Sequence, residues 1–166
     1  MSDVLIAVIS DTHLPRGARH IPDQCIEHMR AADLILHAGD FVSVEALEEI
    51  EAIGPPLAAV HGNVDSMDVR RRVPAERVVD ADDLKIGMLH DAGPSRGRLE
   101  RMRARFPDAA AVVYGHSHIP LHEHADDGFQ LFNPGSPTDR RRQPRHTMGL
   151  AETSAGAIAF ELVVLD

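Results

Sequence analysis

Five short apolar runs in this chain are each followed at once by an aspartate, a histidine or an asparagine, and this recurrence is what most constrains the fold. The first run, residues 4–9, has no helical period, which predicts a strand buried on both faces. Because α/β sheets build their sites at strand ends, five such ends predict one converging cluster. The runs are residues 4–9, 34–36, 57–60, 84–89 and 111–114, and the polar segments after them are Asp11-Thr12-His13, Gly39-Asp40, Gly62-Asn63, His90-Asp91 and Gly115-His116-Ser117-His118.

Helical segments separate the first three runs. Pro22 suits the start of a helix over residues 22–29, and Ser43 can cap a helix over 44–53. The order β-α-β-α-β predicts parallel strands with helices packed on the sheet. The remaining predicted elements are a hairpin over residues 78–89 around an acidic turn at 80–83, a basic helix at 98–106, and strands at 129–132, 147–152 and 157–165.

We therefore expect an α/β fold with two packed mixed β-sheets flanked by helices, in which parallel strands give way to antiparallel ones. The pattern shows no repeat, linker or low-complexity tract, so we expect a single domain over residues 1–166.

Composition limits the classes of function. The chain has 17 Lys and Arg against 26 Asp and Glu, a net charge of −9, which argues against extended binding of nucleic acid. No apolar run approaches the roughly 20 residues that span a bilayer, and Met1-Ser2-Asp3 lacks the basic region of a signal peptide. A single cysteine, Cys25, excludes an internal disulfide and a thiolate metal site. We expect a globular cytoplasmic protein that does not enter membranes.

The polar segments suit metal binding. Asp11 and His13 occupy alternate positions, which point the same way in an extended segment and can grip one cation, and His116 and His118 share this spacing. Nitrogen and oxygen ligands without thiolate suit Mn, Fe, Co, Ni or Zn. Each segment alone is also an ordinary turn or cap, and the ordered set of five carries the prediction. Seven candidate ligands are too many for one tetrahedral ion but suit two ions that share a carboxylate.

In the order and spacing of these motifs, the chain resembles the calcineurin-like metallophosphoesterase superfamily. The Gly62-Asn63-Val64-Asp65 segment and the downstream Asn133-Pro134-Gly135-Ser136 are similar to its small single-domain bacterial and archaeal phosphodiesterases. The resemblance covers nearly the whole chain and implies a four-layer α/β/β/α sandwich.

The resemblance also implies a site of two divalent transition-metal ions, with manganese the first candidate and Fe, Ni, Co or Zn the others. One ion would be held by Asp11, His13 and His118, the second by Asn63, His90 and His116, and Asp40 would bridge the two. Asp11, Asp40, Asn63 and His116 would serve catalysis, in which a hydroxide shared by the ions attacks phosphorus.

The implied function is hydrolysis of a small organic or nucleotide-like phosphodiester. A phosphomonoesterase of the same mechanism is one alternative. A non-catalytic protein-interaction scaffold is the other, because a eukaryotic retromer subunit resembles this family. Family members often self-associate, so a homo-oligomer is a further expectation.

Two positions depart from the family pattern. Val64 stands where larger members carry a histidine that protonates the leaving group, so we consider water, Asp65 or His37 for that role. Asp91 stands where a glycine is usual after the ligand histidine, and either orients His90 or, as we favour, is a turn acid.

The other histidines and the arginines are less constrained. His37 and His61 lie near the predicted ligands and either support them or are satisfied polar residues. We expect most of the arginines at 70–72 and 140–142 to be solvated, and at most one or two of those at 140–142 to face substrate. The histidines expected only at the surface are His20, His28, His122, His124 and His146.

Overall fold

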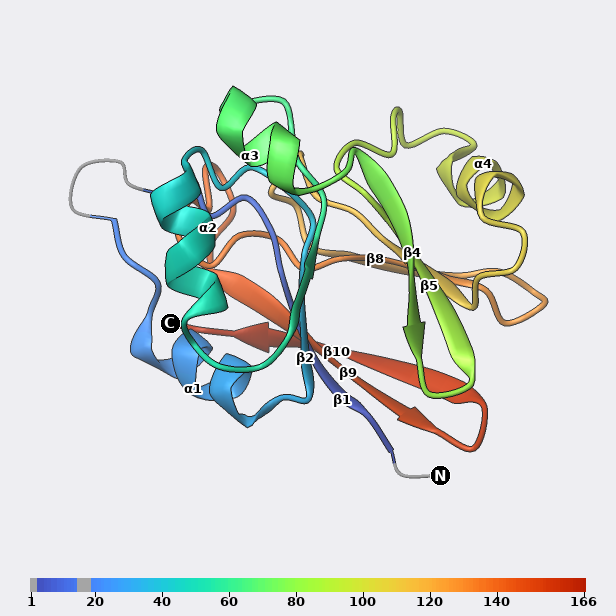
Figure 1. The fold of residues 1–166 in the computed structure, drawn as a ribbon. Helices are drawn as coiled ribbons and strands as arrows, with labels where there is room; N and C mark the ends of the chain where they lie inside the picture. The colour runs from blue at the N-terminus through green and yellow to red at the C-terminus, as the bar shows by residue number, and fades with distance from the viewer. Residues whose placement is uncertain (1–2, 15–18) are drawn as a thin grey trace.

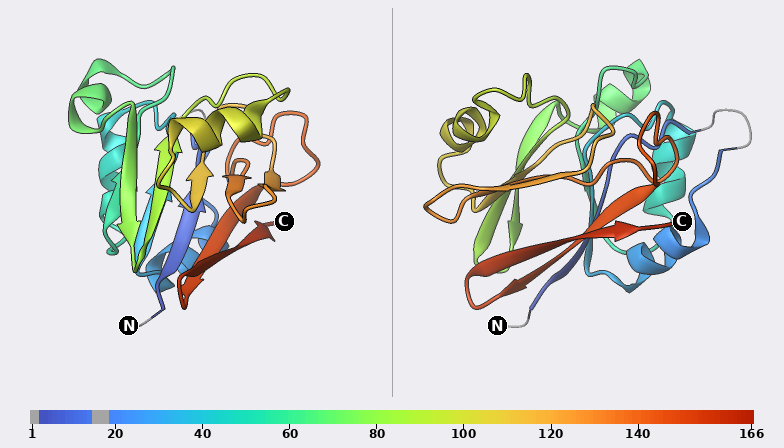
Figure 2. Two further views of the ribbon diagram at one scale, coloured as in Figure 1. Left: turned by 90° about the vertical axis from the view of Figure 1, so that its right-hand side faces the viewer. Right: turned by 180° about the vertical axis from the view of Figure 1, so that it is seen from behind.

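Two five-stranded β-sheets pack face to face, with helices on both outer faces, in the computed structural model (Figures 1 and 2). The structure describes residues 3–14 and 19–166, so Met1 and Ser2, which entered the expectation about a signal peptide, lie outside the described residues. The two packed mixed sheets with flanking helices are the predicted fold class. The helices are α1 (Asp23–Ala31), α2 (Val44–Glu51), α3 (Met67–Arg72) and α4 (Arg98–Arg105).

The first sheet has the order β10-β9-β1-β2-β3. Strands β1 (Leu5–Ile9), β2 (Leu34–His37) and β3 (Leu57–Ala59) are parallel, which confirms the predicted β-α-β-α-β order. Strands β9 (Thr147–Ser154) and β10 (Ala157–Val164) form an antiparallel hairpin that adds to the free side of β1.

The second sheet has the order β4-β5-β6-β8-β7. Strands β4 (Glu76–Ala81) and β5 (Leu84–Leu89) form the predicted hairpin, with a shorter turn than expected because Ala81 pairs with Leu84. The other strands are β6 (Ala111–Val113), β7 (Leu121–His124) and β8 (Gln130–Asn133).

The expectation of antiparallel pairing in the second half is wrong for the centre of this sheet. Strand β6 lies parallel to both β5 and β8. The reason is the connection, since α4 carries the chain from the end of β5 back to the start of β6, and such a crossover makes neighbouring strands parallel.

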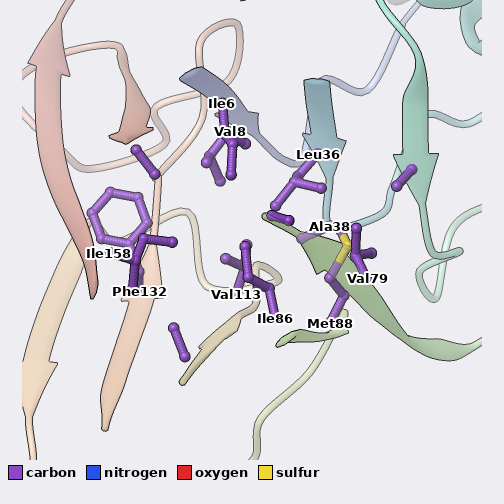
Figure 3. Packing of buried hydrophobic residues seen from close by; sticks show 14 of the residues in the cluster. Ile6, Val8, Leu36, Ala38, Val79, Ile86, Met88, Val113, Phe132 and Ile158 are labelled. Carbon is purple, nitrogen blue, oxygen red and sulfur yellow. The ribbon is translucent and has the colours of Figure 1, made fainter. Parts of the chain in front are cut away.

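The main core lies between the two sheets (Figure 3). Ile6 and Val8 of β1 face this core, whereas Ala7 and Ile9 on the opposite side of the strand pack with α1 and α2. Helix α4 covers the outer face of the second sheet, where Met102 joins a third cluster. A strand buried on both faces explains why residues 4–9 read as a continuous apolar run.

Two elements were not predicted, and several ends shift. Helix α3 follows the Gly62-Asn63 segment and is capped by Ser66, whose Oγ accepts the Val69 N–H at 3.3 Å. Strand β7 forms an edge of the second sheet. The helix predicted to extend to residue 53 ends at Glu51, although Ser43 caps it as expected. None of the helices in the described parts of the chain is long and apolar enough to cross a membrane.

Candidate metal centre

The loops that follow β1, β2, β3, β5 and β6 meet at one end of the two sheets. Backbone bonds join the first sheet's loops, with the Asp11 N–H donating to the Gly39 carbonyl at 2.9 Å. Across the sheets, His90 Nδ1 lies 2.7 Å from the Ala38 carbonyl oxygen. The strand ends named from the sequence therefore converge.

Asp11, His13 and His118 form one buried group. Asp11 Oδ1 lies 3.4 Å from His118 Nε2 and 3.8 Å from His13 Nε2. All three residues are at most 3% exposed, and one ligand atom from each fits within 4.8 Å of the others. These are the residues that the sequence analysis grouped around one ion.

Asp40 lies between this group and the next. Its Oδ2 atom is 3.4 Å from His13 Nε2 and 3.1 Å from His90 Nε2. Asp11, Asp40 and His90 also form a buried group that could hold a cation. A carboxylate oxygen placed between two histidines of different sets is the arrangement that a shared ligand requires.

Asn63 and His116 close the more open side. Asn63 Oδ1 lies 3.0 Å from His90 Nε2 and 3.1 Å from His116 Nδ1. Asn63 is exposed, and the side chain of His116 is 45% exposed. Contacts therefore connect all seven predicted ligands, although His116 belongs to neither compact group of three.

Several buried polar atoms at the centre have no hydrogen-bond partner among the residues that the structure describes. They include Asp11 Oδ1, His118 Nε2 and both ring nitrogens of His13. Buried polar atoms are normally satisfied, so orphaned atoms that converge need an explanation such as an ion. One ring nitrogen from each of His13 and His118, together with Asp11 Oδ1, fits a divalent transition metal. Asn63 Oδ1, which lies against His90 and His116, offers a neutral oxygen to a second set.

The carboxylates and histidines of the site stabilise each other's charged forms. Burial raises the pKa of Asp11, but the neighbouring His118 and His13 outweigh it and hold that pKa well below its usual range. Burial acts in the same direction at Asp40, where His13 and His90 again lower the pKa. Burial lowers the pKa of His13, and the two carboxylates overcome this and raise it to about 9. A cation must therefore displace a proton from His13 in order to bind.

Five of the seven candidate ligands have a left-handed backbone. The φ angles are 58° at Asp11, 47° at His13, 67° at Asp40, 72° at His116 and 62° at His118. The expectation that Asp11 and His13 point the same way along an extended segment is therefore wrong, because tight turns aim both side chains inward. Such conformations are uncommon outside glycine and gather at functional sites.

Glycines let the loops approach closely at two points. A Cβ on Gly62 would lie 2.1 Å from Asp40 Oδ1, and one on Gly115 would lie 2.0 Å from Ser10 Oγ. Any side chain at these positions would displace a loop that carries a candidate ligand.

The Asn133-Pro134-Gly135-Ser136 segment supports the first loop. Ser136 Oγ donates to the Asp11 carbonyl at 2.8 Å, and Thr138 Oγ1 donates to the Thr12 carbonyl at 2.6 Å. The Asp139 carbonyl is hydrogen bonded to His118 Nδ1, which leaves Nε2 of that ring to face Asp11. The sequence marked the segment but gave no signal for Thr138 or Asp139.

The two side chains considered for protonating the leaving group are committed elsewhere. Both carboxylate oxygens of Asp65 accept backbone N–H groups, those of Asp40, Gly62 and Val42, at 2.7–3.0 Å. His37 is fully buried, with Nδ1 accepting the Gly39 N–H and Nε2 3.0 Å from Thr12 Oγ1. Both residues therefore fix the loops and do not face an open site.

Asp91 has the local role that we favoured. Its Oδ1 accepts the Gly93 N–H at 2.8 Å, which makes it a turn acid. Its Oδ2 lies 3.8 Å from His116 Nε2, so the histidine nearest to it is His116 and not His90. Arg140 bonds to the Gln143 carbonyl in its own loop, and a substrate contact by residues 140–142 stays a prediction.

His122 and His124 lie side by side on the exposed face of β7, with ring centroids 4.4 Å apart. His122 Nε2 lies 2.8 Å from Gln130 Oε1. No acidic, cysteine or further histidine side chain in the described ranges completes a group of three with them.

A cavity of about 370 Å³ adjoins the Asn63 side of the centre. His90 and His116 line it together with Asn63, and Arg70 and His61 line it from outside the predicted ligand set. A group attached to a phosphate at the centre could extend into this space.

Comparisons with known proteins identify the family of the chain. The family model described as calcineurin-like phosphoesterase superfamily domain matches residues 4–156. A probable metallophosphoesterase of Methanothermobacter thermautotrophicus is 36% identical over 137 residues, 81% of this chain and 78% of that protein. A phosphodiesterase of Methanocaldococcus jannaschii is 30% identical over 145 residues, 78% of this chain and 82% of that protein.

The fold is similar to vacuolar protein sorting 29 from Cryptosporidium parvum, with a TM-score of 0.78, 22% identity and 97% of both chains covered. That likeness concerns the fold alone, whereas the family match covers all seven candidate ligands from Asp11 to His118. The chain belongs to the calcineurin-like phosphoesterase superfamily.

Proposed function

We propose that this protein is a phosphodiesterase that uses two divalent transition-metal ions to hydrolyse a small organic or nucleotide-like phosphodiester. The observation that carries the proposal is Asp40 Oδ2, which lies between His13 of one ligand set and His90 of the other. The orphaned atoms of Asp11, His13 and His118 support the first ion, and the meeting of His90 and His116 at Asn63 Oδ1 supports the second.

The residues of the chain would divide the work as follows. Asp11, His13 and His118 hold the first ion, Asn63, His90 and His116 hold the second, and Asp40 is shared. A pair of such ions activates water as a nucleophile and offsets the charge that develops on the phosphate. With Oδ1 of Asn63 directed to the histidines, its amide NH₂ can donate to a phosphate oxygen.

A diester is the preferred substrate class for two reasons. The cavity beside Asn63 offers space for an ester group beyond the phosphate, and one relative is named a phosphodiesterase. Because Asp65 and His37 are committed to backbone and loop contacts, we propose that water protonates the leaving group. Rates should then fall steeply as the leaving group becomes more basic.

The decisive experiment compares bis(4-nitrophenyl) phosphate with 4-nitrophenyl phosphate, using chelator-treated protein and Mn, Ni, Fe, Co or Zn. We expect no turnover without metal, restoration by manganese, and a higher kcat/KM for the diester. Asp40→Ala and His116→Ala should each lower kcat on the order of 100-fold or more, because each removes a ligand. His124→Ala, at an exposed position on β7, is the matched control and should keep full activity.

Other outcomes would select the alternatives. A higher kcat/KM for the monoester would indicate a phosphomonoesterase, and two bound ions without hydrolysis of either ester would favour the scaffold. Turnover without metal, or full activity in both ligand variants, would refute the mechanism.

A further inference from the structure

One arginine of α3 turns back onto the loop that carries Asn63. Arg71 pairs with Asp68 in solvent at 3.2 Å, and Arg72 lies 3.5 Å from Glu48 on α2. Arg70 instead is half-buried and lines the cavity beside the candidate metal centre. The run of three arginines thus contains one residue with a different environment.

The guanidinium of Arg70 donates to three backbone carbonyls of this loop. Its Nη2 bonds to the Gly62 carbonyl at 3.0 Å and to the Asn63 carbonyl at 3.1 Å, and its Nε bonds to the Asp65 carbonyl at 3.1 Å. A planar guanidinium holds several acceptors in a fixed geometry, which an ammonium group cannot do.

The same loop is held from its other side by carboxylates. Asp65 Oδ2 accepts the Gly62 N–H at 2.7 Å, and Asp40 Oδ1 accepts the Val64 N–H at 3.0 Å. Two N–H groups of the loop therefore bond to carboxylates, and three of its carbonyls bond to Arg70. Between these two sets of bonds stands Asn63, whose side chain contacts both His90 and His116.

We propose that Arg70 is a positioning residue for the second metal ion, acting through Asn63. The inference rests on the proposed function, in that it requires an ion at Asn63, His90 and His116. The group of Asp11, His13 and His118 shares no hydrogen bond with Arg70 in the described parts of the chain. The loop reaches the first ion's set only through Asp40, so the first ion should depend on this arginine much less than the second.

The test is calorimetric titration of chelator-treated protein with Mn²⁺, comparing Arg70→Met and Arg70→Lys with Arg71→Met as the matched control on the same helix. Wild type should bind two ions, and Arg71→Met should bind each of them with the same affinity as wild type does. Arg70→Met should keep the first ion and bind the second about 10- to 100-fold more weakly, as is usual when a group that orients a ligand is lost. Arg70→Lys should recover only part of this affinity, because it lacks the fork.

Two further readouts separate positioning from a general loss of structure. Millimolar guanidinium ion should restore the affinity for the second ion in Arg70→Ala, whose short side chain leaves room for it. In Arg70→Met, kcat on the nitrophenyl diester should fall at saturating Mn²⁺ with little change in KM. The thermal midpoint of the metal-free variants should stay close to wild type, because the freed carbonyls can bond to water.

Unchanged affinity for both ions in Arg70→Met, or an equal loss at both, would overturn the inference while leaving the proposed function intact. If Arg70→Met does not fold, the same criteria apply to Arg70→Lys. Wild-type protein that binds no second ion would instead refute the dinuclear function, and the inference with it.

Discussion

Left-handed backbone at Asp11, His13, Asp40, His116 and His118 gives the site its shape one residue at a time. Each such residue costs on the order of 1–3 kcal/mol and persists because the surrounding structure holds it. Aspartate and histidine adopt this conformation more readily than most residues, so the ligand types also suit the turns. The sequence named these five residues as candidate ligands but did not predict their conformation. In the loop of Asp11, for example, the conformation depends on bonds from residues more than a hundred positions away.

His37 provides a test at this scale, because it is buried, neutral and joined to two ligand loops. Burial lowers its pKa from an ordinary 6.5 to about 3. In the unfolded chain, His37 therefore takes up a proton near pH 6.5, whereas in the folded protein it stays neutral until a far lower pH. The contribution of His37 to the free energy of unfolding therefore falls as the pH drops through this window, by about 2 kcal/mol between pH 6.5 and pH 5.

We expect His37→Asn to be less stable than wild type at pH 7, since it disturbs the bonds to Gly39 and Thr12. At pH 5 the difference in free energy of unfolding between wild type and the variant should be smaller by about 2 kcal/mol. The reason is that wild type loses the contribution of neutral His37 at this pH, whereas asparagine does not titrate. Urea denaturation at both pH values in the presence of chelator measures this, with His124→Asn as control. A gap of constant size would show that His37 is not held neutral.

At the scale of elements, the pattern of apolar runs predicted the strands that carry ligands, because those strands are buried on both faces. It failed for α3 and β7, which have little apolar content to reveal them. Only Val69 is buried in α3, and β7 reads Leu-His-Glu-His with no fully buried residue. These two elements are fixed by caps and pairing partners, which a single segment of sequence does not display.

The loop between β3 and α3 depends on one carboxylate. Asp65 accepts three backbone N–H groups, and its removal leaves them without that partner. Asp65→Ala should lower the free energy of unfolding by about 3 kcal/mol. Asp68→Ala, on the exposed face of α3, should change it by less than about 0.5 kcal/mol. Equal effects in urea denaturation would contradict the assigned role of Asp65.

At the scale of the whole molecule, the sequence predicted that two sheets pack together, but it did not predict how closely their side chains approach each other. Gly149 on β9 leaves room for the ring of Phe132 on β8, and a Cβ at position 149 would lie 2.4 Å from that ring. Phe132 is only 1% exposed, and its ring stacks on that of Phe160 with centroids 4.6 Å apart. The glycine had no visible role in the sequence because its partner belongs to the other sheet.

Gly149→Ala should therefore destabilise the protein by about 1–3 kcal/mol through overpacking. Phe132→Leu should also destabilise it, by opening space in the core. In the double variant the added methyl group can use that space, so the combined loss should be smaller than the sum of the two. Additive changes in urea denaturation would show that the two residues do not compete for the same volume.

The bonds from Ser136 and Thr138 to the loop of Asp11 also matter during synthesis. They link residues 125 and 126 positions apart, and β1 gains its β9 partner only from residue 147 onward. A ribosome therefore releases Asp11 and His13 long before the residues that fix their conformation have been made. The growing chain carries its first two candidate ligands in an unfixed loop, so the candidate metal centre can take its final geometry only when translation of the domain is nearly complete.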